Sequence, residues 1–190
     1  LGGSCSICAI EDGRSVANSF GMTAQSGVMH NNRVGDFDAF ALLKLVNDRR
    51  GLSEVFRRLS KEGGLLGISG VSNDLRDVTR AAGDGNPRAA LAVGAFVESV
   101  RHYVGAYLAV LGGCDALVFT GGIGENAAEI RRDVCYRLHF AGIELDEAKN
   151  NQRGGERRLD TASSNTEIWV LPTNEELVVA RQTVEVLKFN

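Results

Sequence analysis

Three glycines within four residues mark residues 121–126, which read GGIGEN and follow the apolar run 117–119. This pattern is typical of a turn between a strand and a helix. Glycine lets the backbone approach a ligand closely, and a helix N-terminus carries partial positive charge. We therefore expect backbone N–H groups of this turn to face nucleotide phosphates. A glycine turn that serves chain geometry alone is the alternative, since the segment matches neither a P-loop nor a dinucleotide fingerprint.

A second polar cluster, DLRD, occupies residues 74–77 after a glycine-containing turn. Leu75 and Arg76 are suited to form the walls of a pocket for a planar base, because a guanidinium group stacks well on aromatic faces. The alternative is an ordinary helix start in which Ser72 or Asn73 is the N-cap and the acids complement the helix dipole.

Arg33 stands alone among polar residues in the segment NRVGDFD, residues 32–38. A guanidinium group there can clamp a phosphoryl group through two parallel hydrogen bonds. A surface ion pair of Arg33 with Asp36 or Asp38 is the alternative.

Two acids follow Pro172 where a strand is expected to end and a helix to begin, in the segment PTNEEL. Carboxylates at a helix start are favourable to the helix dipole, which is the structural interpretation. They are also placed to hold Mg²⁺ beside nucleotide phosphates, and Glu175 is the candidate ligand.

The composition of the 190 residues is that of a folded protein, with 44% hydrophobic residues. The net charge of -3 argues against non-specific binding to nucleic acid. No apolar run has the length of a membrane span.

Cys5 and Cys8 have a C-x-x-C spacing, but an extended strand there would turn them to opposite sides, so we expect reduced cytoplasmic thiols rather than a metal or redox pair. The opening residues LGGS suggest the remainder of a longer chain.

Apolar periodicity predicts an α/β fold, with a mixed sheet flanked by helices. The apolar face of the central helix is expected to be buried through Leu91, Val93, Ala95, Phe96, Val100, Val104, Tyr107, Leu108 and Leu111. In the first half of the chain we expect a hairpin of strands 4–10 and 15–18, a loop over 19–36, and helices over 38–49 and 53–61, the second capped by Ser53. A glycine-rich connector over 63–70 and helices over 74–82 and 87–111 follow, the last capped by Asn86. In the second half we expect a strand over 116–120, a helix over 125–140, a surface loop over 152–165, a strand over 168–171 and a closing helix over 174–187.

Together, the four segments NRVGDFD, GVSNDLRD, GGIGEN and PTNEEL resemble the carboxyl-terminal part of the acetokinase family, over residues 1–183. This family is a branch of the sugar kinase, Hsp70 and actin superfamily. The resemblance implies an actin-like ATPase (ribonuclease H-like) domain, with residues 1–190 as the carboxyl-terminal nucleotide-binding domain and the amino-terminal domain absent from this chain. It also implies a cytoplasmic homodimer that does not bind nucleic acid or membranes.

The activity implied by the resemblance is reversible transfer of a phosphoryl group from ATP to acetate, giving acetyl phosphate and ADP, with Mg²⁺. Arg33 matches the arginine that contacts the transferred phosphoryl group, and Glu175 matches the acid associated with Mg²⁺. The residues that match nucleotide-binding positions of the family are Gly2, Gly3, Ser4, Asp74, Leu75, Arg76, Gly122, Ile123 and Asn126.

The first hairpin departs from the family pattern, because Gly3, Ser4 and Cys5 stand where Asn-Gly-Ser is usual. Two alternatives therefore stay open at this point. The chain could be a non-catalytic nucleotide-binding or assembly module derived from the kinase, or part of a propionate or butyrate kinase that acts on another short carboxylate.

Overall fold

A computed structural model of the chain describes residues 1–47 and 49–188, apart from the side chain of Glu175. It has the α/β architecture expected, with two small sheets. Strands β1 (Cys8–Glu11) and β2 (Arg14–Asn18) form an antiparallel hairpin. Strand β3 (Ala116–Phe119) pairs in parallel with β5 (Glu167–Val170), which pairs antiparallel with the short β4 (Arg157–Arg158), so the second sheet is mixed.

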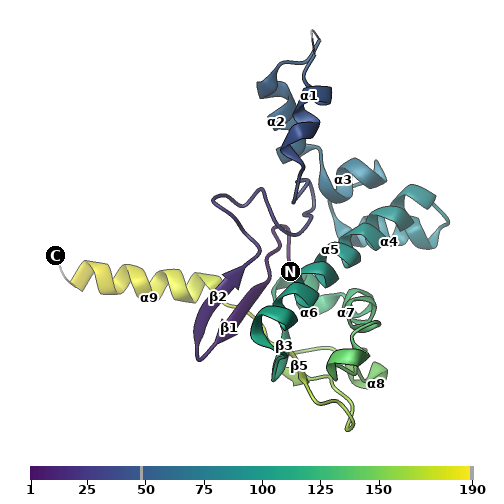
Figure 1. The fold of residues 1–190 in the computed structure, drawn as a ribbon. Helices are drawn as coiled ribbons and strands as arrows, with labels where there is room; N and C mark the ends of the chain where they lie inside the picture. Colours follow the sequence, from purple (N-terminus) through teal and green to yellow (C-terminus); the bar gives the residue numbers. More distant parts are fainter. Residues whose placement is uncertain (48, 189–190) are drawn as a thin grey trace.

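The long helix α5 (Pro87–Leu111) lies at the centre of the structure and contacts α3, α4, α7 and β1 (Figure 1). Its limits are those the sequence predicts. The Asn86 side chain accepts hydrogen bonds from two backbone N–H groups of the first turn, and Gly112 ends the helix in the left-handed conformation at φ 72°. The core it forms is built from Ala89, Ala92, Phe96, Val97, Val100, Val104 and Leu108. The prediction for Leu91 was wrong, because its side chain is 64% exposed.

Helices α3 (Gly64–Ser69) and α4 (Leu75–Gly83) pack on the first half of α5. The sequence predicted a connector where α3 forms, because the helix contains two glycines and is flanked by two more, and glycine disfavours helices. Gly64 has a φ of +61°, and a Cβ there would meet the carbonyl oxygen of His30 at 2.0 Å. This glycine therefore allows α3 to begin directly against the segment that carries Arg33.

The region before α3 contains less helix than predicted. A single helix was expected over residues 38–49, whereas the structure has a 3₁₀ turn η1 (Ala39–Ala41) followed by the four-residue α1 (Leu42–Leu45). Helix α2 (Leu52–Lys61) has Gly51 as its N-cap, so Ser53 lies inside the helix and does not cap it. The predicted loop over residues 19–36 is confirmed. A hairpin precedes it as predicted, but its first strand β1 spans Cys8–Glu11 rather than residues 4–10, so residues 4–7 lie outside the sheet.

The segment after β3 is broken into several short helices: α6 (Gly121–Asn126), α7 (Ala128–Cys135), the 3₁₀ turn η2 (His139–Ala141) and α8 (Glu147–Asn150). One helix over 125–140 was predicted. Ala127 interrupts it, because this residue has φ -95° and ψ 85°, outside the helical region. The final helix α9 (Glu175–Lys188) extends away from the central elements, as Figure 1 shows.

All four cysteines are free thiols, with Cys5 buried and Cys8 exposed. The expectation that one strand holds both residues was wrong, because Cys5 precedes β1. In the residues that the structure describes, no helix is both long and apolar enough to cross a membrane.

Candidate functional site

A cavity of about 400 Å³ lies between the first residues of the chain, the start of α4 and helix α6. Every residue that the sequence predicts to bind a nucleotide, except Ser4, lines this cavity. Asn31, Ala127 and Glu129 complete the lining. Residues from three distant parts of the sequence are therefore brought to one place.

The α4 wall of the cavity begins at Asp74, which is the N-cap of the helix. Its carboxylate accepts a hydrogen bond from the backbone N–H of Arg76 at 2.9 Å and from Nε of the same arginine at 3.0 Å. These bonds hold the pKa of Asp74 at about 2, well below its ordinary value. The prediction of Ser72 or Asn73 as the N-cap was wrong, because the cap is the next residue, Asp74. Ser72 instead accepts from the backbone N–H of Asp74 at 3.0 Å and supports the turn.

The α6 wall is helical from its first glycine, which changes how it can act. The backbone N–H groups of Ile123 and Gly124 donate to the carbonyl oxygen of Leu1, at 2.8 and 3.1 Å. The N–H of Gly121 donates to Oε1 of Glu125 at 3.0 Å. The expectation that this segment offers bare N–H groups to phosphates was therefore wrong for these three positions. What α6 presents to the cavity is Gly122 with the side chains of Ile123 and Asn126.

Glycine is required at the start of α6 by a close backbone contact. Gly121 has a φ of +75°, and a Cβ there would lie 2.8 Å from the carbonyl oxygen of Leu1. The same oxygen accepts the two N–H groups of α6 described above, so the first residue of the chain and α6 are held together. This contact fixes the distance between two walls of the cavity.

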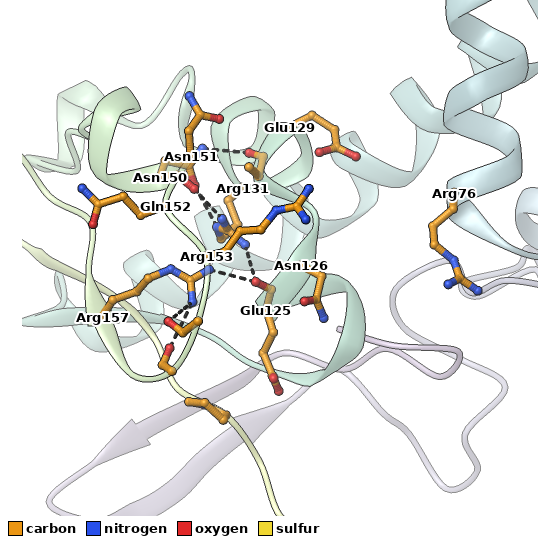
Figure 2. Close-up of a pocket in the computed structure, with 14 residues that line it drawn as sticks. Arg76, Glu125, Asn126, Glu129, Arg131, Asn150, Asn151, Gln152, Arg153 and Arg157 are labelled. Carbon is orange, nitrogen blue, oxygen red and sulfur yellow. Dashed lines mark hydrogen bonds between the residues drawn. The ribbon is translucent and has the colours of Figure 1, made fainter.

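Helix α6 is fixed at its other end by buried polar contacts that sequence reasoning missed (Figure 2). The guanidinium group of Arg131, which is 1% exposed, donates to the carbonyl oxygens of Gly124 and Glu125 at 2.8 and 3.0 Å. It also donates to Oδ1 and to the carbonyl oxygen of Asn150, both at 2.8 Å. The sequence signal was weak, because an arginine within an amphipathic helix usually faces water.

Glu125 joins the GGIGEN segment to the PTNEEL segment. Besides the N–H of Gly121, its Oε1 atom accepts a long hydrogen bond from the backbone N–H of Thr173 at 3.3 Å. The segment leading to Glu175 thus lies next to α6. The side chain of Glu175 itself is outside the described part of the chain, so the predicted Mg²⁺ ligand stays a prediction. Among the described residues, no group of three or more His, Cys, Asp or Glu side chains could hold a metal ion.

Arg33 is positioned by a segment, residues 30–34, that packs against the start of α3. The carbonyl oxygens of His30 and Asn31 accept the first N–H groups of that helix, those of Leu65 and Leu66, at 3.0 and 2.9 Å. The Nη1 atom of Arg33 donates to Oγ of Ser4 at 2.8 Å and to the carbonyl oxygen of Ala24 at 3.1 Å.

Ser4 directly follows the glycines of the cavity wall, and Asn31 lines the cavity, so Arg33 is anchored at that edge of it. The alternative of an ion pair with Asp36 or Asp38 was wrong. The carboxylate of Asp36 accepts hydrogen bonds from Gly27 and Tyr103, and that of Asp38 caps η1.

His30 belongs to the same segment, and its side chain is fully buried. Its Nδ1 atom accepts a hydrogen bond from the backbone N–H of Cys5 at 2.7 Å, and its ring stacks on Phe20 at 5.8 Å between centroids. Burial, together with the charge of Arg33, lowers the pKa of His30. The neutral ring thereby ties the first residues of the chain to the segment that carries Arg33.

The cavity can thus accommodate a ligand with an apolar planar part and a charged part. Leu75 and Ile123 supply apolar surface, Asp74 and Asn126 supply polar groups, and Arg33 supplies positive charge near the glycine end.

Comparison with known proteins identifies relatives over almost the whole chain. The model of the acetokinase family matches residues 1–181. An acetate kinase from Halothermothrix orenii is 47% identical over 190 residues, which cover 99% of this chain and 48% of that protein. A propionate kinase from Citrobacter rodentium is 47% identical over 188 residues, which cover 98% of this chain and 46% of that protein. The chain therefore spans about half the length of these relatives.

The fold agrees with the sequence match. The crystal structure of an acetate kinase from Porphyromonas gingivalis superposes with a TM-score of 0.92 at 39% identity, covering 98% of this chain and 47% of that one. The expected fold class, an actin-like ATPase domain, is confirmed.

Proposed function

The chain belongs to the acetokinase family, and from this premise we propose that the protein transfers a phosphoryl group reversibly between ATP and acetate, forming acetyl phosphate and ADP. We further propose that residues 1–190 are the carboxyl-terminal nucleotide-binding domain of this enzyme. The observation that carries the proposal is the cavity of about 400 Å³, in which Gly2, Gly3, the start of α4 and helix α6 meet.

The nucleotide base would lie between Leu75 and Ile123, with Asn126 at the end of the cavity. The carboxylate of Asp74 is ionised at neutral pH, since its pKa is about 2, and it can accept hydrogen bonds from ribose hydroxyl groups. The phosphates would then extend toward Gly2 and Gly3, where the absence of side chains leaves room for them.

The reaction would proceed by in-line displacement at the terminal phosphorus, with the carboxylate oxygen of acetate as the nucleophile. Negative charge on the three equatorial oxygens must be stabilised in the transition state. Arg33 is suited to this role, because Ser4 and Ala24 hold only its Nη1 atom, at 2.8 and 3.1 Å. Among the described residues, the Nε and Nη2 atoms of Arg33 make no hydrogen bond, so both can donate in parallel to a phosphoryl group.

The family activity implies Mg²⁺, for which Glu175 is the candidate ligand. Mg²⁺ in kinases is commonly held by one or two carboxylates together with the phosphates, so a single acid near the cavity fits this mode of binding. When bound, the ion would neutralise charge on the phosphates. The hydrogen bond between Thr173 and Glu125 supports this assignment, because it keeps the segment before Glu175 next to α6.

The remaining features of the proposed enzyme follow from the family. Residues of the amino-terminal half would complete the acetate site, so the 190-residue chain alone would bind adenine nucleotide with little turnover. We propose a cytoplasmic homodimer in which α5 takes part. Its exposed Leu91 and Val110 side chains, 64% and 60% exposed, support such a contact.

A propionate kinase is the second candidate, because the propionate kinase of Citrobacter rodentium has the same 47% identity to this chain as the acetate kinase described above. Residues that contact the acyl chain would decide between the two. None of the cavity residues described here discriminates between acids of different length.

The test is an assay of the full gene product with ATP, Mg²⁺ and either acetate, propionate or butyrate. The acyl phosphate that forms is trapped as the hydroxamate and measured. We expect the highest kcat/KM with acetate, and a loss of about 10³-fold in kcat for Arg33→Ala. Higher kcat/KM with propionate would select the second candidate. No acyl phosphate with any acid, while ADP still binds, would favour a non-catalytic nucleotide-binding module.

A further inference from the structure

A second and larger cavity, of about 600 Å³ (Figure 2), lies beside the cavity of about 400 Å³ proposed to bind the nucleotide, which we call the nucleotide cleft. It shares Arg76, Asn126 and Glu129 with that cleft. Its remaining wall is formed by α7, the end of α8 and the loop of residues 151–155, none of which the proposed reaction uses. Four arginines line it, Arg76, Arg131, Arg153 and Arg157, but only two acids, Glu125 and Glu129.

Arg131 at the floor of this cavity is a buried charge without an acidic partner. It is 1% exposed, and all of its hydrogen bonds go to neutral oxygens of Gly124, Glu125 and Asn150. No ion pair within 4.0 Å is found for it among the described residues. Buried charges in proteins are normally paired, because removing an ion from water is costly. The structure thus leaves a positive charge with no counter-ion of its own.

Arg157 adds a second positive charge beside the first. It donates through Nη1 to the carbonyl oxygens of Gly154 and Gly155, both at 3.0 Å, and through Nη2 to that of Glu125 at 2.9 Å. Its buried Nε has no hydrogen-bond partner in the part of the chain that the structure describes. Burial and the charge of Arg157 lower the pKa of Arg131 to about 10, so the two guanidinium groups repel each other.

Arg153 is the third basic residue, and it lies on the rim. In the described residues it makes no hydrogen bond or ion pair, and it lines the same cavity as Arg131 and Arg157. The loop continues into Gly154 and Gly155, with φ of +95° and +48°, where an added Cβ would meet nothing within 4 Å. The loop backbone is therefore open to a ligand that approaches these arginines.

The two acids do not neutralise this cluster. The carboxylate of Glu125 is occupied by the N–H groups of Gly121 and Thr173, and Figure 2 shows it directed away from the guanidinium groups of Arg131 and Arg157. Glu129 forms no ion pair within 4.0 Å in the described residues, although its charge acts on Arg131 from a distance. The lining therefore keeps a net positive charge in a chain whose net charge is -3.

We propose that this cavity, formed by Arg131, Arg153 and Arg157, is a binding site for a phosphate-bearing small molecule, separate from the nucleotide cleft. A phosphate group supplies the negative charge that the buried arginines lack. Four of the five N–H groups of Arg131 already donate to protein oxygens, so this residue contributes mainly its charge. Arg157 can donate through its unpartnered Nε, and the guanidinium group of Arg153 can give two parallel hydrogen bonds from the rim. The volume of about 600 Å³ admits a molecule larger than phosphate itself.

Occupancy of the site would be sensed by the nucleotide cleft through α6. Arg131 and Arg157 both donate to the carbonyl oxygen of Glu125, the residue next to Asn126 of the cleft. A phosphate that draws these guanidinium groups would act directly on the C-terminal end of that helix. By linkage, the ligand and the nucleotide must then alter each other's affinity by the same factor.

The test is calorimetric titration of the encoded protein with pyrophosphate, at constant ionic strength and with saturating ADP so that the nucleotide cleft is filled. Orthophosphate and glycerol 3-phosphate are titrated in parallel, which distinguishes a free oxyanion from a phosphate ester. We expect one pyrophosphate per chain, and affinity at least tenfold lower in Arg153→Gln and in Arg157→Gln. The matched control Arg137→Gln removes an exposed arginine outside the cavity and should leave the affinity unchanged.

The proposal is overturned if pyrophosphate does not bind, if saturating ADP displaces it competitively, or if Arg153→Gln binds it as well as the unchanged protein does. An equal loss in Arg137→Gln would show general attraction by surface charge and would also overturn it. Titration of Arg33→Ala separates this proposal from the proposed function: binding that is independent of Arg33 supports the second site even if the protein proves not to be a kinase.

Discussion

The contact between Gly121 and Leu1 allows the strictest test of how the nucleotide cleft is built. An alanine at position 121 would keep a φ near +75° and bring its Cβ to 2.8 Å from the carbonyl oxygen of Leu1. Since this distance is shorter than real Cβ atoms show, the carbonyl must move. It is also the acceptor for the N–H groups of Ile123 and Gly124, at 2.8 and 3.1 Å, so both hydrogen bonds would be weakened.

The expected loss of stability comes from two sources. A left-handed alanine costs about 1–2 kcal/mol, and weakening two backbone hydrogen bonds costs about 1 kcal/mol more. The smaller entropy of the unfolded alanine chain offsets about 0.5–1 kcal/mol. A net loss of about 2 kcal/mol corresponds to a fall in Tm of about 4–8 °C for a domain of this size. Thermal unfolding followed by circular dichroism measures it, and ADP affinity should fall as well because two walls of the cleft separate.

Gly122→Ala is the matched control, one residue further along. A Cβ at Gly122 meets nothing within 4 Å, its φ is not in the left-handed region, and the residue lies in α6. Alanine there favours the helix by about 1 kcal/mol. We expect an unchanged or higher Tm, with weaker ADP binding because the methyl group enters the cavity. An unchanged Tm in Gly121→Ala, or an equal fall in both variants, would refute the reasoning.

Three further predictions concern the residues around the cleft. Ser4→Ala removes one of the two acceptors of Arg33 Nη1 and should lower kcat about tenfold, the value of a charge-assisted hydrogen bond, with little change in nucleotide KM; an unchanged kcat would contradict the positioning role. His30 has a pKa below 6.5 when folded, so the unfolded chain takes up more protons and Tm should fall as pH drops from 7 to 5. His30→Asn should flatten that dependence, and an equally steep fall in this variant would assign it to other groups. Arg88→Met removes donors to the carbonyl oxygens of Ile68 and Gly67 at the end of α3 and should lower stability by about 1 kcal/mol in urea unfolding; Arg88→Lys should restore part of it.

The elements with strong local signals could be predicted from the sequence. Asn86 and Pro87 define the start of α5 and Gly112 its end, because capping and left-handed glycine are properties of a few adjacent residues. Strands β3 and β5 were also predicted to within about one residue, since short apolar runs between glycine-rich or polar segments are typical of buried strands.

The helices that the sequence did not predict, α3 and α6, form because of contacts with distant parts of the chain. Helix α3 forms in a glycine-rich segment because the carbonyl oxygens of His30 and Asn31 accept its first N–H groups. Helix α6 starts at a glycine because Leu1 lies against it. No periodicity in the local sequence contains these partners, which are more than 30 and more than 100 residues away along the chain.

The residues chosen for the candidate nucleotide site lie together in the fold, while their roles stay predictions. The resemblance to the family selected residues that the fold brings to one cavity. Local reasoning alone left Asp74 and Arg76 as an ordinary helix start, and they do form one, with Asp74 as its cap. The support of α6 by Arg131 and Asn150 was missed, because a buried arginine bound to carbonyl oxygens has no sequence signature.

Titration calorimetry with ADP would establish whether adenine nucleotide binds between α4 and α6. Ile123→Arg would fill the cavity with a long charged side chain, whereas Phe140→Arg places the same residue at a position that is 82% exposed and outside the cavity. We expect one ADP per chain, with affinity at least tenfold lower in Ile123→Arg and unchanged in Phe140→Arg. Unchanged ADP affinity in Ile123→Arg would contradict it.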